Sequence, residues 1–247
     1  MTPLGYSHRG FSPDGAENSI AAFAAAVALG YTHLETDVRA TVDGVAVAFH
    51  DPILDRITNH TGRLVELPWS QVRQARILGR EPIPLLEEVL DGFAEARFNI
   101  DVKSDAAIGP TLDALRRTNS WHRVRLAAFS HRRVRALRRA AGPAVASALS
   151  PPEVLALKVG RLRLPAGLAE SPGLPAAAQV PLGSAALPVI TERFVAAAHR
   201  LRLQVHAWTI NTRAEMTALF DIGVDAIMSD RADLLREVLM ERGAWPN

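Results

Sequence analysis

The chain has 247 residues, a net charge of +2 and no cysteine. This composition excludes disulfides and thiolate metal sites, and so small a charge gives no general attraction to nucleic acid or to a membrane surface. No stretch of about 20 apolar residues could span a bilayer, and residues 1–10 lack the apolar run of a signal peptide. We therefore expect a cytoplasmic protein with no stable membrane insertion and no nucleic-acid partner.

Strand and helix patterns alternate along the chain. The predicted strands cover residues 4–7, 33–38, 45–50, 98–103, 124–129, 144–148, 177–180, 204–210 and 224–228. The predicted helices cover residues 20–29, 85–96, 111–118, 131–141, 152–157, 192–203, 213–222 and 232–242. Residues 51–84 lack long periodicity and are predicted to be an insertion, and residues 161–187 are the least regular part.

This alternation predicts a parallel sheet made of about eight strand–helix units. Eight units in a chain of this length are typical of a (β/α)8 TIM barrel forming one domain, residues 1–247, with a small insertion after strand 2. A doubly wound open sheet is the alternative. The absence of a Gly-x-Gly-x-x-Gly turn after the first strand and of a Walker loop weakens that alternative.

Two carboxylates lie side by side in the strand predicted over residues 33–38. Side chains alternate along a strand, so Glu35 and Asp37 project from the same face. Carboxylates this close raise each other's pKa unless a cation lies between them. That cation could be a divalent metal ion with oxygen ligands or one of the many arginines, and this strand alone does not decide between them.

Other polar residues follow other predicted strands. They are His8-Arg9, His50, Asp101 and Lys103, Trp208, and Ser229-Asp230. In a barrel these positions meet at the carboxyl-terminal rim, where active sites lie. Glu35, Asp37 and Asp101 could therefore supply three oxygen ligands to Mg²⁺ or Ca²⁺.

Histidines and cations would complete a hydrolytic site at this rim. His8 and His50 titrate near neutral pH and are candidates for a general base and a general acid. Arg9 and Lys103 can bind a phosphate group and stabilise charge that develops on it. A phosphodiester substrate would use all of these groups.

Some of these residues also have a structural interpretation. Asp101 and Lys103 could form a salt bridge at the rim, and Trp208 alone could belong to the core. The other six histidines are assigned structural roles; they are His33, His60, His122, His131, His199 and His206.

Three further residues could support the site or could merely shape the backbone. Glu17 and Asn18 could cap the helix that starts at residue 20, or they could contact catalytic side chains. Asp51 could cap the following loop or orient His50.

At these residues the sequence resembles the glycerophosphodiester phosphodiesterase family. The resemblance covers nearly the whole chain and is weakest between Gly142 and Pro188. The matching motifs are His8-Arg9-Gly10, Glu17-Asn18-Ser19, Glu35-x-Asp37, His50-Asp51, Asp55-Arg56, Thr61-Gly62, Ile83-Pro84-x-Leu86-x-Glu88, Asp101-x-Lys103, Val205-x-Ala207-Trp208-Thr209-x-Asn211 and Gly223-Val224-Asp225-x-Ile227-x-Ser229-Asp230.

The resemblance implies a TIM barrel and metal-dependent hydrolysis of glycerophosphodiesters, such as glycerophosphocholine and glycerophosphoethanolamine, to sn-glycerol 3-phosphate and an alcohol. It assigns acid–base catalysis to His8 and His50, phosphate binding to Arg9 and Lys103, the glycerol side to Trp208, a further substrate contact to Gln179, and metal ligation to Glu35, Asp37 and Asp101. The small-molecule diester is the partner that it implies, with Mg²⁺ or Ca²⁺ as cofactor.

One position departs from the family pattern, because the family usually has Glu where this chain has Asp101. The shorter side chain would draw the metal toward its strand or leave a water between them. Asp at this position also resembles phospholipases of the sphingomyelinase D or lysophospholipase D type, which are the alternative enzymes. Those enzymes are typically secreted and disulfide-bonded, and this chain has neither feature.

A barrel that binds a phosphate ligand without turnover is the alternative outside the enzymes. Such a binder would need Arg9 and Lys103 but neither His8 nor His50. The presence of both histidines favours the enzyme.

Overall fold

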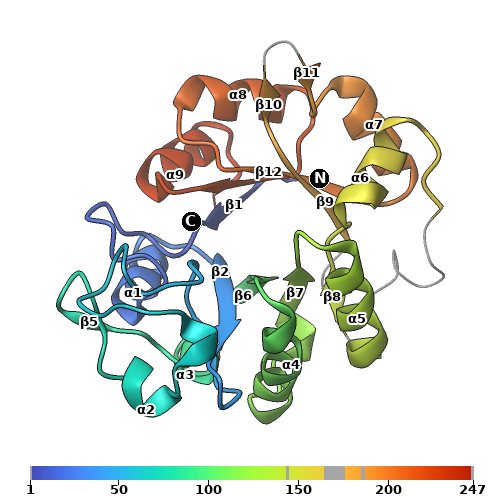
Figure 1. The fold of residues 1–247 in the computed structure, drawn as a ribbon. Helices are drawn as coiled ribbons and strands as arrows, with labels where there is room; N and C mark the ends of the chain where they lie inside the picture. The colour runs from blue at the N-terminus through green and yellow to red at the C-terminus, as the bar shows by residue number, and fades with distance from the viewer. Residues whose placement is uncertain (1, 143–144, 164–175, 185–186, 246–247) are drawn as a thin grey trace.

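Parallel strands form the centre of this computed structural model, which describes residues 2–142, 145–163, 176–184 and 187–245 (Figure 1). The barrel strands are β1 (Leu4–Ser7), β2 (His33–Ala40), β6 (Arg97–Val102), β7 (Val124–Ala127), β8 (Ala146–Ser147), β9 (Ala177–Pro181), β12 (Gln204–Trp208) and β13 (Ala226–Ser229). Hydrogen bonding runs in the order β8-β7-β6-β2-β1-β13-β12-β9, and a parallel bridge between Ala148 and Ala177 joins the two ends. The sheet is therefore a nearly closed barrel of eight strands, which confirms the predicted fold class.

Helices surround the barrel (Figure 1). They are α1 (Ile20–Ala28), α2 (Trp69–Val72), α3 (Leu86–Gly92), α4 (Ile108–Arg117), α5 (His131–Ala141), α6 (Pro151–Lys158), α7 (Glu192–Arg200), α8 (Arg213–Asp221) and α9 (Ala232–Glu241). Side chains of Ser19, Thr191 and Thr212 accept backbone hydrogen bonds and fix where α1, α7 and α8 begin. Among the described residues, no helix has both the length and the apolar character needed to cross a membrane.

The remaining described elements are short. They are the 3-10 turns η1 (Leu64–Glu66), η2 (Asp105–Ala107) and η3 (Trp121–Arg123), and the strand pairs β4 (Arg76–Ile77) with β5 (Glu81–Pro82) and β10 (Gly183–Ser184) with β11 (Leu187–Pro188). Residue 144 of the strand predicted over 144–148 lies outside the described residues. So do residues 164–175 and 185–186 of the segment predicted as irregular.

Strand β3 (Ala46–Ala48) lies outside the barrel and places His50 at its rim. It pairs antiparallel with β2 and is not on the path of the parallel strands. Just beyond it, the backbone N–H of Phe49 donates to the carbonyl of Asp37 (2.9 Å). The backbone of His50 therefore follows directly beside the part of β2 that carries the paired carboxylates.

Residues 51–84 pack against β3 and Phe49 through a small apolar cluster. Phe49, Leu54, Leu64 and Ile77 are fully or almost fully buried in it, together with Val47 of β3. The main core is a separate cluster between the barrel and its helices. Burial of these side chains, worth roughly 1.5–3 kcal/mol each, attaches the segment to the barrel.

Polar side chains fill part of the barrel interior. Arg125 is fully buried and donates hydrogen bonds to Tyr6 Oη (2.9 Å) and Gln204 Oε1 (3.1 Å). Gln204 Oε1 also lies 3.0 Å from Nε2 of the buried His206, whose Nδ1 is 3.4 Å from Gln179 Nε2. A chain of hydrogen bonds thus links the barrel centre to Gln179 at the rim.

Candidate active site

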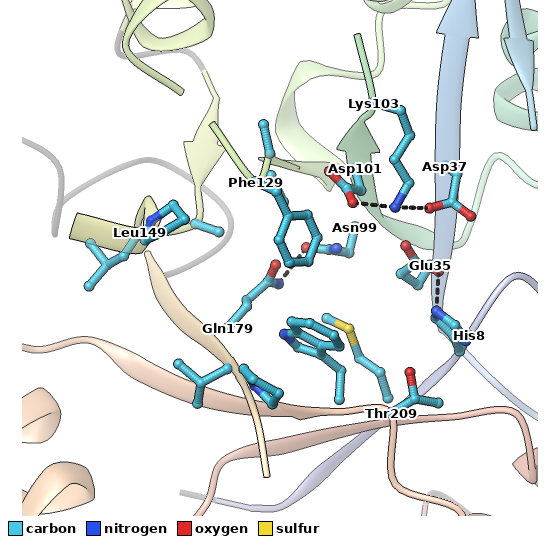
Figure 2. Close-up of a pocket in the computed structure, with 18 of the residues that line it drawn as sticks. His8, Glu35, Asp37, Asn99, Asp101, Lys103, Phe129, Leu149, Gln179 and Thr209 are labelled. Carbon is cyan, nitrogen blue, oxygen red and sulfur yellow. Dashed lines mark hydrogen bonds and ion pairs between the residues drawn. The ribbon is translucent and has the colours of Figure 1, made fainter. Parts of the chain in front are cut away.

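A cavity of about 630 Å³ lies at the carboxyl ends of the barrel strands. Nine of the residues that the sequence singles out line it. They are His8, Arg9, Glu35, Asp37, His50, Asp101, Lys103, Gln179 and Trp208. Figure 2 shows the acidic and basic side chains on one side of this cavity.

The pairing of β2 with β6 brings the acidic side chains together. Glu35 is opposite Asn99, and Asp37 is opposite Asp101. Lys103, just past the end of β6, places its Nζ 2.8 Å from Asp37 Oδ1 and 2.6 Å from Asp101 Oδ2 (Figure 2). The ammonium group therefore lies between the two aspartates, where a cation is expected.

The turn after β1 wraps the Arg9 backbone and side chain around these acids. Arg9 and Gly10 both have left-handed backbone angles (φ 57° and 79°), and a Cβ on Gly10 would lie 2.6 Å from the backbone of α1. Only glycine fits there. The Arg9 N–H donates to Glu35 Oε2 (3.1 Å), its Nε lies 3.0 Å from Asp37 Oδ2, and its Nη1 donates to Glu17 Oε1 (3.1 Å).

His8 lies between two carboxylates. Its Nδ1 is 2.6 Å from Asp230 Oδ1, and its Nε2 is 3.7 Å from Glu35 Oε2. Burial alone would lower the pKa of His8, but Glu35 and Asp230 outweigh burial and raise that pKa above its ordinary value. Asn211 donates to the second oxygen of Asp230 (2.9 Å) and so holds this carboxylate in place.

His50 has a similar carboxylate partner. Its Nδ1 is 2.6 Å from Asp51 Oδ1, and its carbonyl accepts a hydrogen bond from Arg39 Nε (2.6 Å). Arg56 contacts Asp51 Oδ2 and also donates to Glu17 Oε1 (2.5 Å). Because Glu17 in turn contacts Arg9, Arg56 links the support of His50 to the support of Arg9.

Asn18 touches the acidic pair and does not cap the helix. Its Nδ2 donates to Asp37 Oδ2 (3.0 Å), while its Oδ1 accepts from Thr36 Oγ1 (2.8 Å). The N-cap of α1 is Ser19, which accepts from the N–H of Ala22. Of the two interpretations of Asn18, the structure therefore shows the contact with a site carboxylate.

Burial and charge give the three acids different protonation behaviour. Burial, together with the charge of Asp37, raises the pKa of Glu35 to about 7. Burial also acts on Asp37, but Lys103 and Arg9 outweigh it and lower the pKa of Asp37. The pKa of Asp101 is raised, mainly by burial.

The donor chemistry fits a hard divalent cation. Asp37 Oδ1 and Asp101 Oδ1 are buried and accept no hydrogen bond from any residue that the structure describes, although Lys103 Nζ lies 2.8 Å from the first of them. In the part of the chain that the structure describes, no three acidic or histidine side chains converge as a ready-made metal site. A metal ion held by Glu35, Asp37 and Asp101 would thus compete with Lys103 for the two aspartates.

Phe129 and Asn99 are among the residues of the cavity wall that were not predicted. Phe129 follows β7 and meets Trp208 edge to face, with 5.2 Å between ring centroids, and it also lies 5.5 Å from Lys103 Nζ. Asn99 accepts a hydrogen bond from Gln179 Nε2 (2.6 Å). The sequence could have indicated both residues, because Phe129 ends a predicted strand and Asn99 lies on the same face of its strand as Asp101.

Comparison with known proteins identifies the family. The model of the glycerophosphoryl diester phosphodiesterase family matches residues 8–234. The chain belongs to this family. It is 39% identical to the probable glycerophosphodiester phosphodiesterase 2 of Mycobacterium tuberculosis, over 98% of this chain and 92% of that protein. It is 27% identical to a glycerophosphodiester phosphodiesterase of Caldanaerobacter subterraneus, over 98% of this chain and all of that protein.

Solved structures share the barrel. A putative glycerophosphoryl diester phosphodiesterase of Agrobacterium tumefaciens superposes with a TM-score of 0.80 at 21% identity, covering 98% of this chain and 99% of that one. A phosphodiesterase of Oleispira antarctica, in complex with the product sn-glycerol-3-phosphate, superposes with a TM-score of 0.76 at 20% identity, covering 97% of each chain. The family assignment makes this chain a phosphodiesterase, and these structures agree on its fold.

Proposed function

We propose that this phosphodiesterase hydrolyses glycerophosphodiesters such as glycerophosphocholine and glycerophosphoethanolamine, with a divalent cation, to sn-glycerol 3-phosphate and an alcohol. One observation supports this most. Two imidazoles, each with its Nδ1 against an aspartate, line a single cavity together with two basic side chains and three acidic ones. The product bound in the Oleispira structure supports the same substrate class.

The two histidines act as a proton-transfer pair. Because Asp230 and Asp51 hold the Nδ1 atoms of His8 and His50, Nε2 of each ring is left to exchange protons with the substrate. One imidazole removes the proton from the attacking hydroxyl as its oxygen bonds to phosphorus. The other protonates the alcohol oxygen as its bond to phosphorus breaks. If the attacking hydroxyl is that of a water, sn-glycerol 3-phosphate forms directly. If it is that of a neighbouring glycerol carbon, a cyclic phosphate forms first, and a water then opens it to sn-glycerol 3-phosphate.

The two basic side chains bind the phosphate group of the substrate. Arg9 and Lys103, now held by acidic side chains, contact the anionic oxygens of the diester and stabilise charge in the transition state. Glu35, Asp37 and Asp101 hold the cation, Mg²⁺ or Ca²⁺, which supplies further neutralisation of the phosphate charge when bound.

The other predicted residues contact the substrate or hold other site residues in place. Trp208 lines the glycerol side and Gln179 contacts the substrate at the rim. Glu17, Asn18 and Asp51 hold Arg9, Asp37 and His50 through the hydrogen bonds given above. A cytoplasmic location stays a prediction.

Turnover with defined cations tests this function. The purified chain is incubated with glycerophosphocholine or glycerophosphoethanolamine, with a chelator, Mg²⁺ or Ca²⁺, and sn-glycerol 3-phosphate and the free alcohol are quantified. We expect both products in equal amounts, loss of turnover with the chelator, and recovery with at least one cation. Binding of the diester without release of products would instead indicate a phosphate-binding barrel. Undiminished turnover in the chelator would contradict the role of the cation.

A further inference from the structure

Arg56 lies between β3 and α3 and contacts two acids that come from different parts of the chain. Its Nε contacts Asp51 Oδ2, and its Nη2 donates to Glu17 Oε1 (2.5 Å). Asp51 directly follows His50, whereas Glu17 belongs to the loop between β1 and α1. Because the guanidinium group is planar and rigid, the two contacts fix these acids relative to one another.

Each of the two acids holds a side chain that lines the cavity. Asp51 Oδ1 is 2.6 Å from Nδ1 of His50, and Glu17 Oε1 accepts a hydrogen bond from Nη1 of Arg9 (3.1 Å). His50 and Arg9 both line the cavity, and Arg56 is not among the described residues that do so. Arg56 is therefore placed to act on both of these side chains through their carboxylate partners.

The ring of His50 depends strongly on this support. In the described part of the chain, Asp51 is the single hydrogen-bond partner of the ring, and 32% of the His50 side chain is exposed to competing water. The backbone carbonyl of His50 is held separately, by Nε of Arg39 (2.6 Å). Losing Arg56 would therefore free the Asp51 carboxylate to rotate and would disturb the ring more than the backbone.

Arg9 depends on the same support much less. Its backbone N–H donates to Glu35 Oε2 (3.1 Å), and its Nε lies 3.0 Å from Asp37 Oδ2. These contacts remain when Glu17 loses Arg56. We therefore expect the loss of Arg56 to affect proton transfer by the imidazole more than phosphate binding.

The backbone that carries Arg56 is anchored on both sides. Leu54 and Ile57 are buried in the small apolar cluster, and Asp55 accepts a hydrogen bond from the backbone N–H of Gly62 (3.0 Å). The Arg56 side chain itself is 47% exposed. Exposed ion pairs contribute about 1 kcal/mol or less to stability, so these contacts should matter little for unfolding.

Charge supports the same arrangement. Burial raises the pKa of Asp51, but the hydrogen bonds from Arg56 and His50 outweigh burial and lower that pKa. Asp51 is therefore ionised and accepts the proton-bearing Nδ1 of His50. A carboxylate in this position fixes the orientation of an imidazole and leaves its Nε2 toward the substrate.

We propose, resting on the function proposed above, that Arg56 is a positioning residue of the phosphodiester hydrolysis. It holds Asp51, and through it the ring of His50, at a fixed place relative to the loop that carries Glu17 and Arg9. Arg56 acts only through these acids.

A matched pair of variants tests the proposal. Arg56→Met should lower kcat for glycerophosphocholine about 10- to 100-fold, while KM stays within about threefold of wild type. Arg213→Met is the control, because Arg213 also contacts two acids, Glu237 and Glu241, and is 42% exposed, but it joins α8 to α9 away from the cavity lining. Arg213→Met should keep wild-type kinetics, and the melting temperatures of the two variants should be similar.

A double-mutant cycle tests the route through Asp51. If Arg56 acts through this carboxylate, adding Arg56→Met to Asp51→Asn should lower kcat by no more than about twofold further. If the two residues act independently, their separate losses should multiply. Should Arg56→Met be unfolded at the assay temperature, Arg56→Lys replaces it. Its ammonium group keeps the charge but not the rigid planar fork, so its kcat should be at least about threefold below wild type.

The outcomes separate this proposal from the proposed function. Wild-type kcat in Arg56→Met, or in Arg56→Lys where that variant is needed, overturns the role of Arg56 and leaves the proposed function standing. A rise in KM alone, or losses that multiply in the double variant, also overturns it. If the wild-type protein fails to hydrolyse glycerophosphodiesters with any cation, the proposed function is overturned, and the inference with it.

Discussion

Asp37 and Asp101 occupy the same register position on the neighbouring strands β2 and β6, and Lys103 Nζ lies within 2.8 Å of an oxygen of each. One ammonium group therefore neutralises two buried acids that would otherwise repel one another. This relationship allows the contribution of Lys103 to stability to be tested separately from its proposed role in turnover.

Lys103→Met should lower both the stability of the protein and its turnover. Asp101 loses its ion pair with Lys103, while Asp37 keeps Arg9 as its cation. The lost pairing costs on the order of 3 kcal/mol, and turnover should fall roughly 10²- to 10³-fold. Because Mg²⁺ or Ca²⁺ can replace the lost charge, the cation should raise the melting temperature of the variant more than that of wild type. Thermal unfolding with cation or chelator measures this. Lys158→Met, at the only other lysine of the sequence, is the control and should match wild type.

His50→Ala should abolish turnover while the protein stays folded. Loss of one partner of the proton-transfer pair costs about 10²- to 10⁴-fold in kcat. His50 keeps about a third of its side chain exposed, so the melting temperature should change little. Steady-state kinetics and thermal unfolding are compared with His60→Ala, a histidine whose ring contacts Asn59 away from the cavity lining. Wild-type turnover in His50→Ala would remove His50 from the mechanism.

Asp230→Asn should shift the pH profile without abolishing activity. The carboxylate raises the pKa of His8, so an amide at this position should move the His8 limb of the kcat/KM profile to lower pH. Loss of orientation should cost about tenfold in kcat, less than His8→Gln. The profile is measured beside Asp233→Asn, which removes a carboxylate that pairs with Arg231 instead. An unchanged profile in Asp230→Asn would show that the contact does not tune His8.

His33 should make the fold less stable in mild acid than it would be without this residue. Burial, with the charges of Arg97 and Arg125, lowers the pKa of His33 from 6.5 to about 4. The folded state therefore keeps this ring neutral, which stabilises it fully above pH 6.5 and progressively less as the pH falls toward 4. The loss amounts to at most about 3 kcal/mol. Glu35 acts in the opposite direction, because its raised pKa favours the folded state at low pH.

A comparison of variants isolates this contribution. The free energy of unfolding in urea is measured between pH 7 and pH 4.5 for wild type, His33→Gln and the exposed-site control His122→Gln. His33→Gln should lose less stability than wild type over this interval, and His122→Gln should follow wild type. Equal declines in all three proteins would contradict the role of His33.

The sequence predicts elements well where local signals agree. The bounds predicted for α5, residues 131–141, are those observed, because Ser130 caps the helix and Gly142 ends it. Helix α4 begins earlier than predicted, at Ile108, since Pro110 is tolerated in a first turn. Helix α3 ends earlier, at Gly92, because the chain leaves the helix there to reach β6. Single residues near element ends thus decide most differences.

The site residues are predictable where strands carry them, because parallel strands present their carboxyl ends at one rim. Pairings between distant segments are not predictable in this way. The sequence places His8 and Asp230 at the same rim, but nothing in their spacing indicates that the two side chains are in contact across 222 positions of sequence. The position of Lys103 between two aspartates likewise depends on the register of β2 with β6, which one sequence does not reveal.

The imidazoles of His8 and His50 are positioned by different parts of the fold. His8 directly follows a barrel strand. His50 instead follows β3, which packs into the small apolar cluster with Phe49, Leu54 and Ile77. Loosening that cluster would leave the barrel intact yet let the two rings drift apart. If His50 acts as proposed, we therefore expect turnover to depend on packing in a segment outside the barrel. Damage to that packing should give a protein that is folded but turns over slowly.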